Sequence, residues 1–250
     1  MSTEIAISGL KKSFRSKHIL RGVDLVAPAG QNTVIIGGSG TGKSVLLKCV
    51  LGLVKPDAGT ILLDGQAADD DRDAFLARFG MLFQGAALFD SLSVWENVAF
   101  RLRRGSGKIA KAQARELAIE KLRRVGLGAD VADQFPAELS GGMQKRVGLA
   151  RAIATDPQII FFDEPTTGLD PIMAGVINEL IVEITEEMGA TGMTITHDMT
   201  SVRVIADQVA MLHDGLIRWT GPSEAIDDSG DPYVDQFVTG RAEGPIAAVR

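Results

Sequence analysis

The sequence contains almost no cysteine, and this scarcity excludes several kinds of protein. Cys49 is the single cysteine among 250 residues, so an intrachain disulfide is impossible and a thiolate metal cluster is not expected. Because Cys49 lies in an apolar helical stretch, residues 45–51, we expect it to be a small buried hydrophobe.

Excess positive charge and long apolar runs are missing as well. The net charge is -6, from 26 basic and 32 acidic residues that are mixed along the chain, which argues against a nucleic-acid binder. Residues 1–4 lack the basic start and apolar run of a signal peptide, and no stretch is long and apolar enough to cross a bilayer. We therefore expect a cytosolic protein whose role at a membrane, if it has one, is exercised through partners.

Short apolar runs alternate with helical patterns through most of the chain. The runs expected to form strands are residues 32–36, 59–65, 159–162, 191–196 and 209–213. Residues 171–188 read as a helix, because Pro171 after Asp170 suits a first helical position. This alternation predicts an α/β fold, with a mostly parallel sheet wrapped by helices.

One region departs from this alternation. Residues 93–155 hold several helical patterns and few strand patterns, and residues 108–125 are rich in helix formers before Gly126. We therefore expect an α-helical subdomain, about residues 86–157, inserted into a domain that spans residues 1–240. Residues 241–250 form a tail, preceded by a short helix around residues 233–238.

Residues 37–44 fit the pattern G-x-x-x-x-G-K-S after a strand and before a helix. In this context the pattern predicts a phosphate loop, whose N–H groups and helix N-terminus face an anion. Lys43 is expected to reach the β- and γ-phosphates and the Ser44 hydroxyl to bind Mg²⁺. A plain glycine turn is the alternative. The residues assigned to nucleotide binding here are Gly37, Gly38, Ser39, Gly40, Thr41, Gly42, Lys43, Ser44 and Val45.

Two carboxylates follow a fully apolar strand. Asp163 ends this strand and is expected to hold Mg²⁺ through water, while Glu164 is placed to polarise a water that attacks the γ-phosphate. An ordinary acidic turn before Pro165 is the alternative interpretation.

Ser140, Gly141 and Gly142 open a helix and form a second place suited to phosphate. Ser140 is a good N-cap, and the two glycines let an anion approach bare N–H groups. Since this segment and the phosphate loop lie on different lobes, we predict that it meets the γ-phosphate bound to another copy of the chain. A capped helix start without ligand is the alternative.

Residues 139–144, Leu-Ser-Gly-Gly-Met-Gln, resemble the signature of the ATP-binding cassette (ABC) family, and the other segments occur in that family's order over roughly residues 5–222. The resemblance implies a P-loop NTPase with an ABC-type ATPase core, an inserted α-helical subdomain and N-terminal antiparallel β strands. It also implies two copies that stack head to tail around ATP and Mg²⁺, hydrolyse the ATP and then part.

The same resemblance implies roles for four further residues. Gln84 senses the γ-phosphate and binds the metal, and His197 contacts the γ-phosphate and orients the water activated by Glu164. Asp170 belongs to a loop that crosses between the copies, and Phe14 stacks on adenine. A structural or merely exposed histidine, and a plain core phenylalanine, are the alternatives. The implied catalytic set is Glu164, His197, Gln84 and Lys43, and the implied metal ligands are Ser44, Gln84 and Asp163.

Two stretches resemble one branch of this family, the Mla-type phospholipid-transport ATPases. One is residues 81–89 with residues 94–98, and the other is the C-terminal segment from Asp231 to Phe237, followed by Gly240 and Gly244-Pro245. The resemblance implies lipid transport between bacterial inner and outer membranes, with the chain on the cytoplasmic face of the inner membrane. It also implies integral membrane permease partners, an MCE-type lipid-binding periplasmic subunit, a tail that reaches the partner ATPase, and no nucleic acid.

Other interpretations remain open. An ATPase of another ABC importer or exporter, such as a nutrient-uptake or solvent-tolerance system, shares every phosphate residue. A soluble cassette protein of DNA repair or translation usually has a long coiled-coil insertion or two cassettes, and this sequence shows neither. A binding module without turnover is expected to lack Glu164 or His197, and both are present here. The apolar residues 85–91 either receive a permease helix or pack inside the lobe. Residues 101–104 are interpreted as a solvated basic face, with an anion site or contact with lipid headgroups as the alternatives.

Overall fold

Two compact units make up the computed structural model, which describes residues 2–67, 72–104 and 107–247. We call Asp73–Gly192 the helical unit, and Thr3–Arg72 with Met193–Arg250 the phosphate-loop unit. The predicted helical subdomain, residues 86–157, lies within the helical unit, and its boundaries stay a prediction. Of the predicted tail, residues 248–250 lie outside the described residues.

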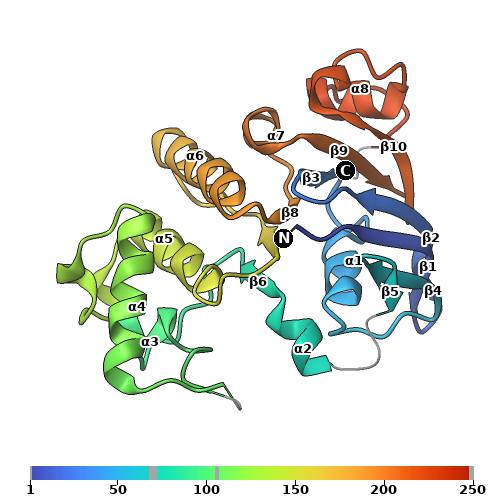
Figure 1. Cartoon of the computed structure of the whole chain (residues 1–250). Coiled ribbons are helices and arrows are strands. Elements are labelled where there is room, and N and C mark those ends of the chain that lie inside the picture. Colours follow the sequence, from blue (N-terminus) through green and yellow to red (C-terminus); the bar gives the residue numbers. More distant parts are fainter. Residues whose placement is uncertain (1, 68–71, 105–106, 248–250) are drawn as a thin grey trace. The chain divides into compact units, whose positions relative to one another are not determined.

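The phosphate-loop unit contains two sets of strands (Figure 1). One sheet has the order β2-β1-β4-β5, and the strands β10-β9-β3-β8 are neighbours in the other. The elements are β1 (Ile5–Phe14), β2 (Lys17–Ala27), β3 (Asn32–Ile36), α1 (Lys43–Val50), β4 (Ala58–Leu63), β5 (Gln66–Ala67), β8 (Thr191–Ile195), α7 (Met199–Ile205), β9 (Gln208–His213), β10 (Leu216–Pro222) and α8 (Pro232–Thr239). Both β2 and β4 pair antiparallel with β1, which confirms the expected antiparallel N-terminal strands.

β3 positions the phosphate loop. Its five residues are all buried, as expected for a strand covered on both faces. It pairs in parallel with β9, with Thr33 opposite Gln208 and Ile36 opposite Met211. This register fixes the end of β3 within the sheet, so the loop that follows begins from a rigid point.

The helical unit is built around a short parallel pair of strands and a cluster of helices. Its elements are α2 (Arg72–Ala77), β6 (Phe79–Leu82), α3 (Val94–Val98), α4 (Lys111–Arg124), α5 (Gly141–Ala152), β7 (Ile159–Asp163) and α6 (Pro171–Met188). β6 pairs with β7 from Phe79 opposite Ile159 to Leu82 opposite Phe162. α5 contacts β6, α3, α4 and α6, so it is the central helix of this unit.

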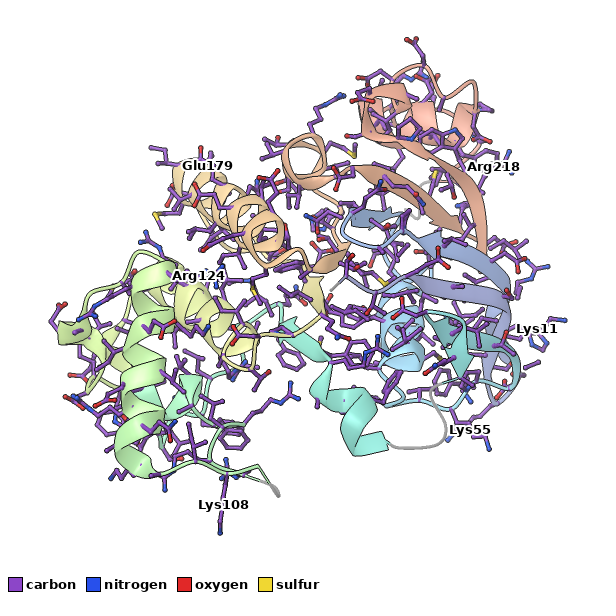
Figure 2. The ribbon with its side chains drawn as sticks, in the orientation of Figure 1. Lys11, Lys55, Lys108, Arg124, Glu179 and Arg218 are labelled. Atoms are coloured by element: carbon purple, nitrogen blue, oxygen red, sulfur yellow. The ribbon has the colours of Figure 1, made fainter. Side chains whose placement is uncertain are left out.

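Polar contacts tie the outer helices of this unit together. Arg124, at the end of α4, pairs with Glu187 of α6 at 2.6 Å between Nη2 and Oε2. Figure 2 labels Arg124 there, while Lys108, Lys55 and Lys11 extend away from the ribbon.

Among the described residues, no helix combines the length and apolarity needed to cross a membrane.

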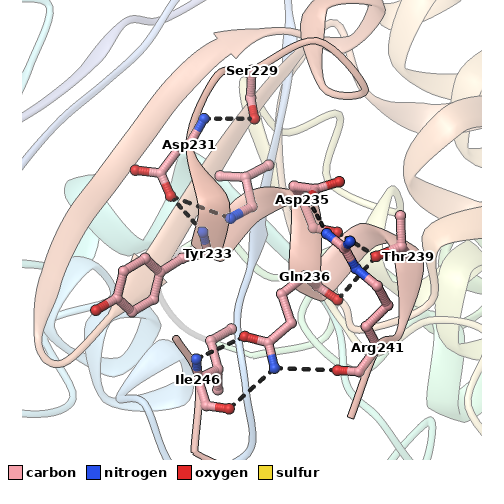
Figure 3. A network of polar contacts seen from close by, with 9 residues as sticks. Ser229, Asp231, Tyr233, Asp235, Gln236, Thr239, Arg241 and Ile246 are labelled. Carbon is pink, nitrogen blue, oxygen red and sulfur yellow. Dashed lines mark hydrogen bonds and ion pairs between the residues drawn. The ribbon is translucent and has the colours of Figure 1, made fainter. Parts of the chain in front are cut away.

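The C-terminal segment folds back on α8, as Figure 3 shows. The side chain of Gln236 is 5% exposed, and its Oε1 accepts a hydrogen bond from the Ile246 N–H at 2.7 Å. Its Nε2 donates to the Ile246 and Arg241 carbonyl oxygens, each at 3.1 Å. The short helix predicted around residues 233–238 is thereby confirmed, and it holds part of the tail of its own chain. The tail's contact with a partner ATPase stays a prediction.

Candidate nucleotide site

The phosphate loop joins β3 to α1 and is curled by glycines in the left-handed region. Gly37 has φ +150°, and a Cβ at this position would lie 2.3 Å from the Leu212 carbonyl oxygen. Gly40 and Gly42 also have positive φ, at 76° and 109°. Residues with a Cβ rarely adopt such angles, so the glycines permit the turn that aims N–H groups inward.

Lys43 lies over this loop. Its Nζ donates to the Gly37 carbonyl oxygen at 2.7 Å and to that of Gly38 at 3.0 Å. Ser39, Gly40 and Ser44 are exposed, while Gly38, Thr41 and Val45 are half-buried. The N-cap of α1 is Gly42, which has no side chain to cap the helix. The first N–H groups of α1 and the Lys43 ammonium therefore face the same loop, an arrangement that suits an anion.

His197 and Phe14 belong to the same unit as this loop. The Thr196 N–H donates to the Ile35 carbonyl oxygen at 3.4 Å, which places the residue before His197 beside the end of β3. His197 is exposed. The Phe14 ring is 47% exposed, with Lys12 Nζ at 5.4 Å from its centroid. This exposure excludes the alternative that Phe14 is a core residue.

The two adjacent carboxylates lie in the helical unit. Asp163 ends β7, and Glu164 follows it in the left-handed region with φ +47°. Thr167 holds this turn, since its Oγ1 donates to Glu164 Oε2 at 3.1 Å and its N–H donates to the Glu164 carbonyl oxygen at 3.3 Å. Asp163 and Glu164 are both half-buried residues.

Gln84 also belongs to the helical unit and is exposed after β6. The turn that follows it is unusual, because Ala86 and Ala87 have φ of +57° and +48°. Arg151 of α5 donates from Nη2 to the Ala86 carbonyl oxygen at 2.5 Å and from Nη1 to that of Ala87 at 2.6 Å. The backbone after Gln84 is thus held from α5.

The signature segment starts α5, as predicted. The Ser140 Oγ accepts a hydrogen bond from the Met143 N–H at 3.3 Å, which confirms Ser140 as the N-cap. Ser140 and Gly141 are exposed, whereas Gly142 is buried. Asp170 is exposed and caps α6, accepting from the Ile172 and Met173 N–H groups at 3.0 Å each.

Lys145 of α5 connects two of these segments, and the sequence analysis did not identify it. Its Nζ donates to the carbonyl oxygens of Gln84 and Glu164, the latter at 3.2 Å. Burial lowers the pKa of Lys145 below its ordinary value, although the Asp163 and Glu164 carboxylates act to raise it. Burial alone lowers the pKa of Arg151 in the same helix.

The predicted site residues fall into two groups. The phosphate loop, His197 and Phe14 lie in the phosphate-loop unit, while Gln84, Asp163, Glu164, residues 140–142 and Asp170 lie in the helical unit. No three His, Cys, Asp or Glu side chains of the described chain gather closely enough to hold a metal. The predicted Mg²⁺ ligands are a hydroxyl, an amide and a carboxylate, and such oxygen donors fit Mg²⁺ when phosphates complete its coordination.

Comparisons with known proteins agree with this set of segments. The ABC transporter family model matches residues 20–167. The probable ribonucleotide transport ATP-binding protein mkl of Mycobacterium tuberculosis is 42% identical over 250 residues, or 98% of this chain and 69% of the relative. The intermembrane phospholipid transport system ATP-binding protein MlaF of Haemophilus influenzae is 41% identical over 246 residues, or 97% of this chain and 92% of the relative.

A solved structure gives the same result. The ATP-binding cassette MJ0796, in a dimeric post-hydrolysis state bound to ADP and Pi, matches with a TM-score of 0.79 and 30% identity. The match covers 88% of this chain and 98% of that one. The chain therefore belongs to the ABC transporter family, as an ATP-hydrolysing cassette subunit that resembles the phospholipid-transport branch.

Proposed function

We propose that this chain drives phospholipid transport between the inner and outer membranes of a bacterium. The observation that carries the proposal is the similarity to the H. influenzae phospholipid transport subunit over 97% of this chain and 92% of that relative. The resemblance of residues 81–89, of residues 94–98 and of the segment from Asp231 onward to the same branch supports it.

The working form that we propose is a head-to-tail homodimer. Two helix N-termini suited to phosphate, those of α1 and α5, lie in different units of the chain. The similar cassette MJ0796 was solved as a dimer. In this proposal the phosphate loop of one copy and Ser140–Gly142 of the other contact the same ATP, so loss of the γ-phosphate releases the copies from each other.

Each site residue has a part in this chemistry. Lys43 and the loop amides hold the phosphates, and Phe14 offers its exposed ring to adenine. Glu164 accepts the proton of the attacking water, His197 orients that water, and Gln84 senses the γ-phosphate. Ser44, Asp163 and Gln84 would hold Mg²⁺, which when bound neutralises charge on the phosphates.

The membrane partner that we propose docks beside the turn after Gln84. Phe83 and Phe89 are 39% and 43% exposed, and the Phe89 ring stacks on Phe100 with centroids 4.3 Å apart. A hollow of about 190 Å³ adjoins this stack, lined by Leu92, Glu96, Phe100, Arg103 and Arg104. Exposed aromatic rings beside a hollow are typical of interaction sites. A permease helix docked here keeps the chain on the cytoplasmic face of the inner membrane. The MCE-type subunit that we propose lies on the periplasmic side of the same membrane.

A second function is favoured by a specific observation. The mycobacterial relative, named for ribonucleotide transport, is 42% identical and matches this chain as well as the lipid-transport relative does. An importer of a polar solute is therefore the alternative, and it uses the same ATP chemistry.

Purification from host membranes followed by transport measurement tests the proposal. We expect the tagged chain to bring down a permease and an MCE-type protein, identified by mass spectrometry. In proteoliposomes, this complex should transfer labelled phospholipid when ATP is present. Glu164→Gln should lower phosphate release roughly 100- to 10,000-fold, as loss of a general base does, while leaving ATP binding intact.

The outcomes separate the two functions. Stimulation of ATP hydrolysis by ribonucleotide, together with a co-purified periplasmic solute receptor and no lipid transfer, contradicts the lipid proposal. Wild-type phosphate release by Glu164→Gln contradicts the assignment of Glu164 as the base. Glu179→Gln, an acidic residue of α6, serves as the matched control and should keep the wild-type rate.

A further inference from the structure

A buried lysine joins the two catalytic turns of the helical unit. Lys145 is only 5% exposed, and it lies on α5 five residues after Ser140. Its ammonium donates to the backbone carbonyl oxygens of Gln84 and Glu164. These are the residues to which the proposed function gives the γ-phosphate sensor and the base.

Burying an ammonium group is unfavourable unless hydrogen bonds replace its water. Lys145 meets this requirement with backbone oxygens, which remain neutral whatever happens at the ATP. Hydrogen bonds from a charged donor are stronger than those between neutral groups. Lys145 therefore fixes the two carbonyls more firmly than an uncharged side chain would.

The Glu164 backbone needs such support. Its φ of +47° lies in the left-handed region, which a residue with a long side chain adopts only when its surroundings enforce it. Lys145 contacts the carbonyl oxygen of this residue at 3.2 Å. A rotation of the peptide group here would redirect the Glu164 carboxylate, so the hydrogen bond helps set where the carboxylate points.

The segment after Gln84 is held by the same helix through close packing. A Cβ at Gly148 would lie 2.8 Å from Leu82 Cδ1 and 3.2 Å from Ala86 Cβ, so α5 approaches β6 as closely as a glycine allows. Arg151, six residues after Lys145 on the same helix, donates to the Ala86 and Ala87 carbonyl oxygens. α5 thus acts as a fixed support for both turns.

We propose that Lys145 is a positioning residue for ATP hydrolysis, because it holds the Gln84 and Glu164 backbones in one fixed relation on α5. The proposal rests on the proposed roles of Gln84 and Glu164. It assigns Lys145 no contact with ATP and no proton transfer. Its loss should misplace the base without removing a ligand of the nucleotide.

The test compares two variants of Lys145 in the full-length chain. Lys145→Met keeps the length of the side chain but removes its donors, and we expect kcat for ATP to fall roughly 10- to 100-fold, as misplaced catalytic groups do. We expect KM for ATP to change less than about threefold, because ground-state binding is retained. Lys145→Arg keeps a cation with N–H donors and should recover most of kcat.

Lys121→Met is the matched control. Lys121 is also 5% exposed in the helical unit, but its Nζ pairs with Asp156 Oδ1 at 2.7 Å, whereas that of Lys145 binds the Gln84 and Glu164 carbonyls. Its loss should lower the urea midpoint while leaving kcat per folded molecule unchanged. If Lys145→Met does not fold, Lys145→Gln replaces it in the same comparison, because the glutamine side chain is shorter and carries no charge.

Three results overturn the proposal: wild-type kcat in Lys145→Met, an equal loss of kcat in Lys121→Met, or no recovery in Lys145→Arg that folds normally. The Glu164→Gln variant distinguishes this failure from that of the proposed function. If Glu164→Gln is inactive and Lys145→Met is fully active, only the role of Lys145 is wrong. If Glu164→Gln is active, the assignment of the base is wrong.

Discussion

The two helices that begin at glycine-containing segments, α1 and α5, differ in how they treat their N-termini. α1 starts after Gly42, and its first residue, Lys43, adds a positive charge over the phosphate loop. α5 starts after Ser140, whose hydroxyl already accepts the Met143 N–H. The buried cation of α5, Lys145, is directed to the Gln84 and Glu164 carbonyls instead of to the helix start.

Because of this difference, the two helix starts suit different steps. The start of α1 suits binding of a free anion, and the start of α5 suits contact with an anion that is already bound. The N-terminus of α1, with a lysine and the loop amides, suits an anion that arrives from solution. At the N-terminus of α5, one N–H already donates to the Ser140 cap. The lysine of this helix, Lys145, donates to the Gln84 and Glu164 carbonyl oxygens and not to a ligand at the helix start. The start of α5 is therefore suited to an anion that something else already holds, as in the proposed dimer.

Replacing the lysine of α1 should produce the larger effect. Lys43→Ala removes the ammonium that we propose to contact phosphate, so we expect the chain to bind ATP about 10- to 100-fold more weakly, which corresponds to about 1.4–2.8 kcal/mol. Isothermal titration at concentrations where the chain is monomeric measures this. The control is Lys48→Ala, an exposed lysine in the last turn of the same helix. Wild-type affinity in Lys43→Ala would show that the comparison is wrong for α1.

Changing the cap of α5 should leave this binding intact and affect a later step. Ser140→Asp keeps a good N-cap but places a negative charge where the second phosphate contact is proposed. We expect unchanged ATP affinity of the monomer, near wild-type stability, and turnover lowered roughly tenfold or more by like-charge repulsion. Phosphate release and sedimentation with ATP measure turnover and dimer formation.

Ser140→Ala separates the cap from the phosphate contact. It loses the hydrogen bond to Met143 and should cost about 1 kcal/mol of stability, measured by urea unfolding. It adds no charge, so it should keep more turnover than Ser140→Asp. If Ser140→Asp hydrolyses ATP like the wild type, the start of α5 does not meet a phosphate.

Local sequence patterns were enough to predict several elements and the cap of α5. The buried run before the phosphate loop is β3 with the predicted bounds, residues 32–36, and the helix after Asp170 has the predicted bounds, residues 171–188. Ser140 is an N-cap as predicted. These features depend on neighbours in the sequence, such as a capping hydroxyl three residues before its N–H, so the sequence contains the information.

The role of Lys145 depends on contacts that have no sequence pattern. The acceptors of Lys145 are backbone oxygens 61 and 19 residues away, and every residue type carries such an oxygen. The solvated basic face predicted for residues 101–104 agrees with the exposure of residues 101, 103 and 104, but the sequence does not show the long-range contacts of Arg101. Its guanidinium donates to the Leu76 carbonyl oxygen at 2.8 Å and to that of Phe79.

The smallest expected effect concerns the C-terminal end of α1, where Cys49 is packed in the core. In α5, by contrast, the buried side chain is a cation, Lys145. Cys49 is buried, as predicted, and burial raises the pKa of its thiol to about 11 from 9.0, against a lowering effect of Lys12. The folded state therefore keeps its thiol proton where the unfolded state loses it. This contribution is fully present below about pH 9 and is lost as the pH rises towards about 11.

Cys49→Ala removes this titration and keeps a small apolar side chain. We expect unchanged ATP hydrolysis, because Cys49 faces the core and not the phosphate loop. The difference in unfolding free energy between wild type and Cys49→Ala, measured by urea titration, should favour the wild type near neutral pH and shrink from pH 9 to 11. A difference that stays constant over this range would mean that the Cys49 thiol is not desolvated and that the end of α1 is not tightly packed.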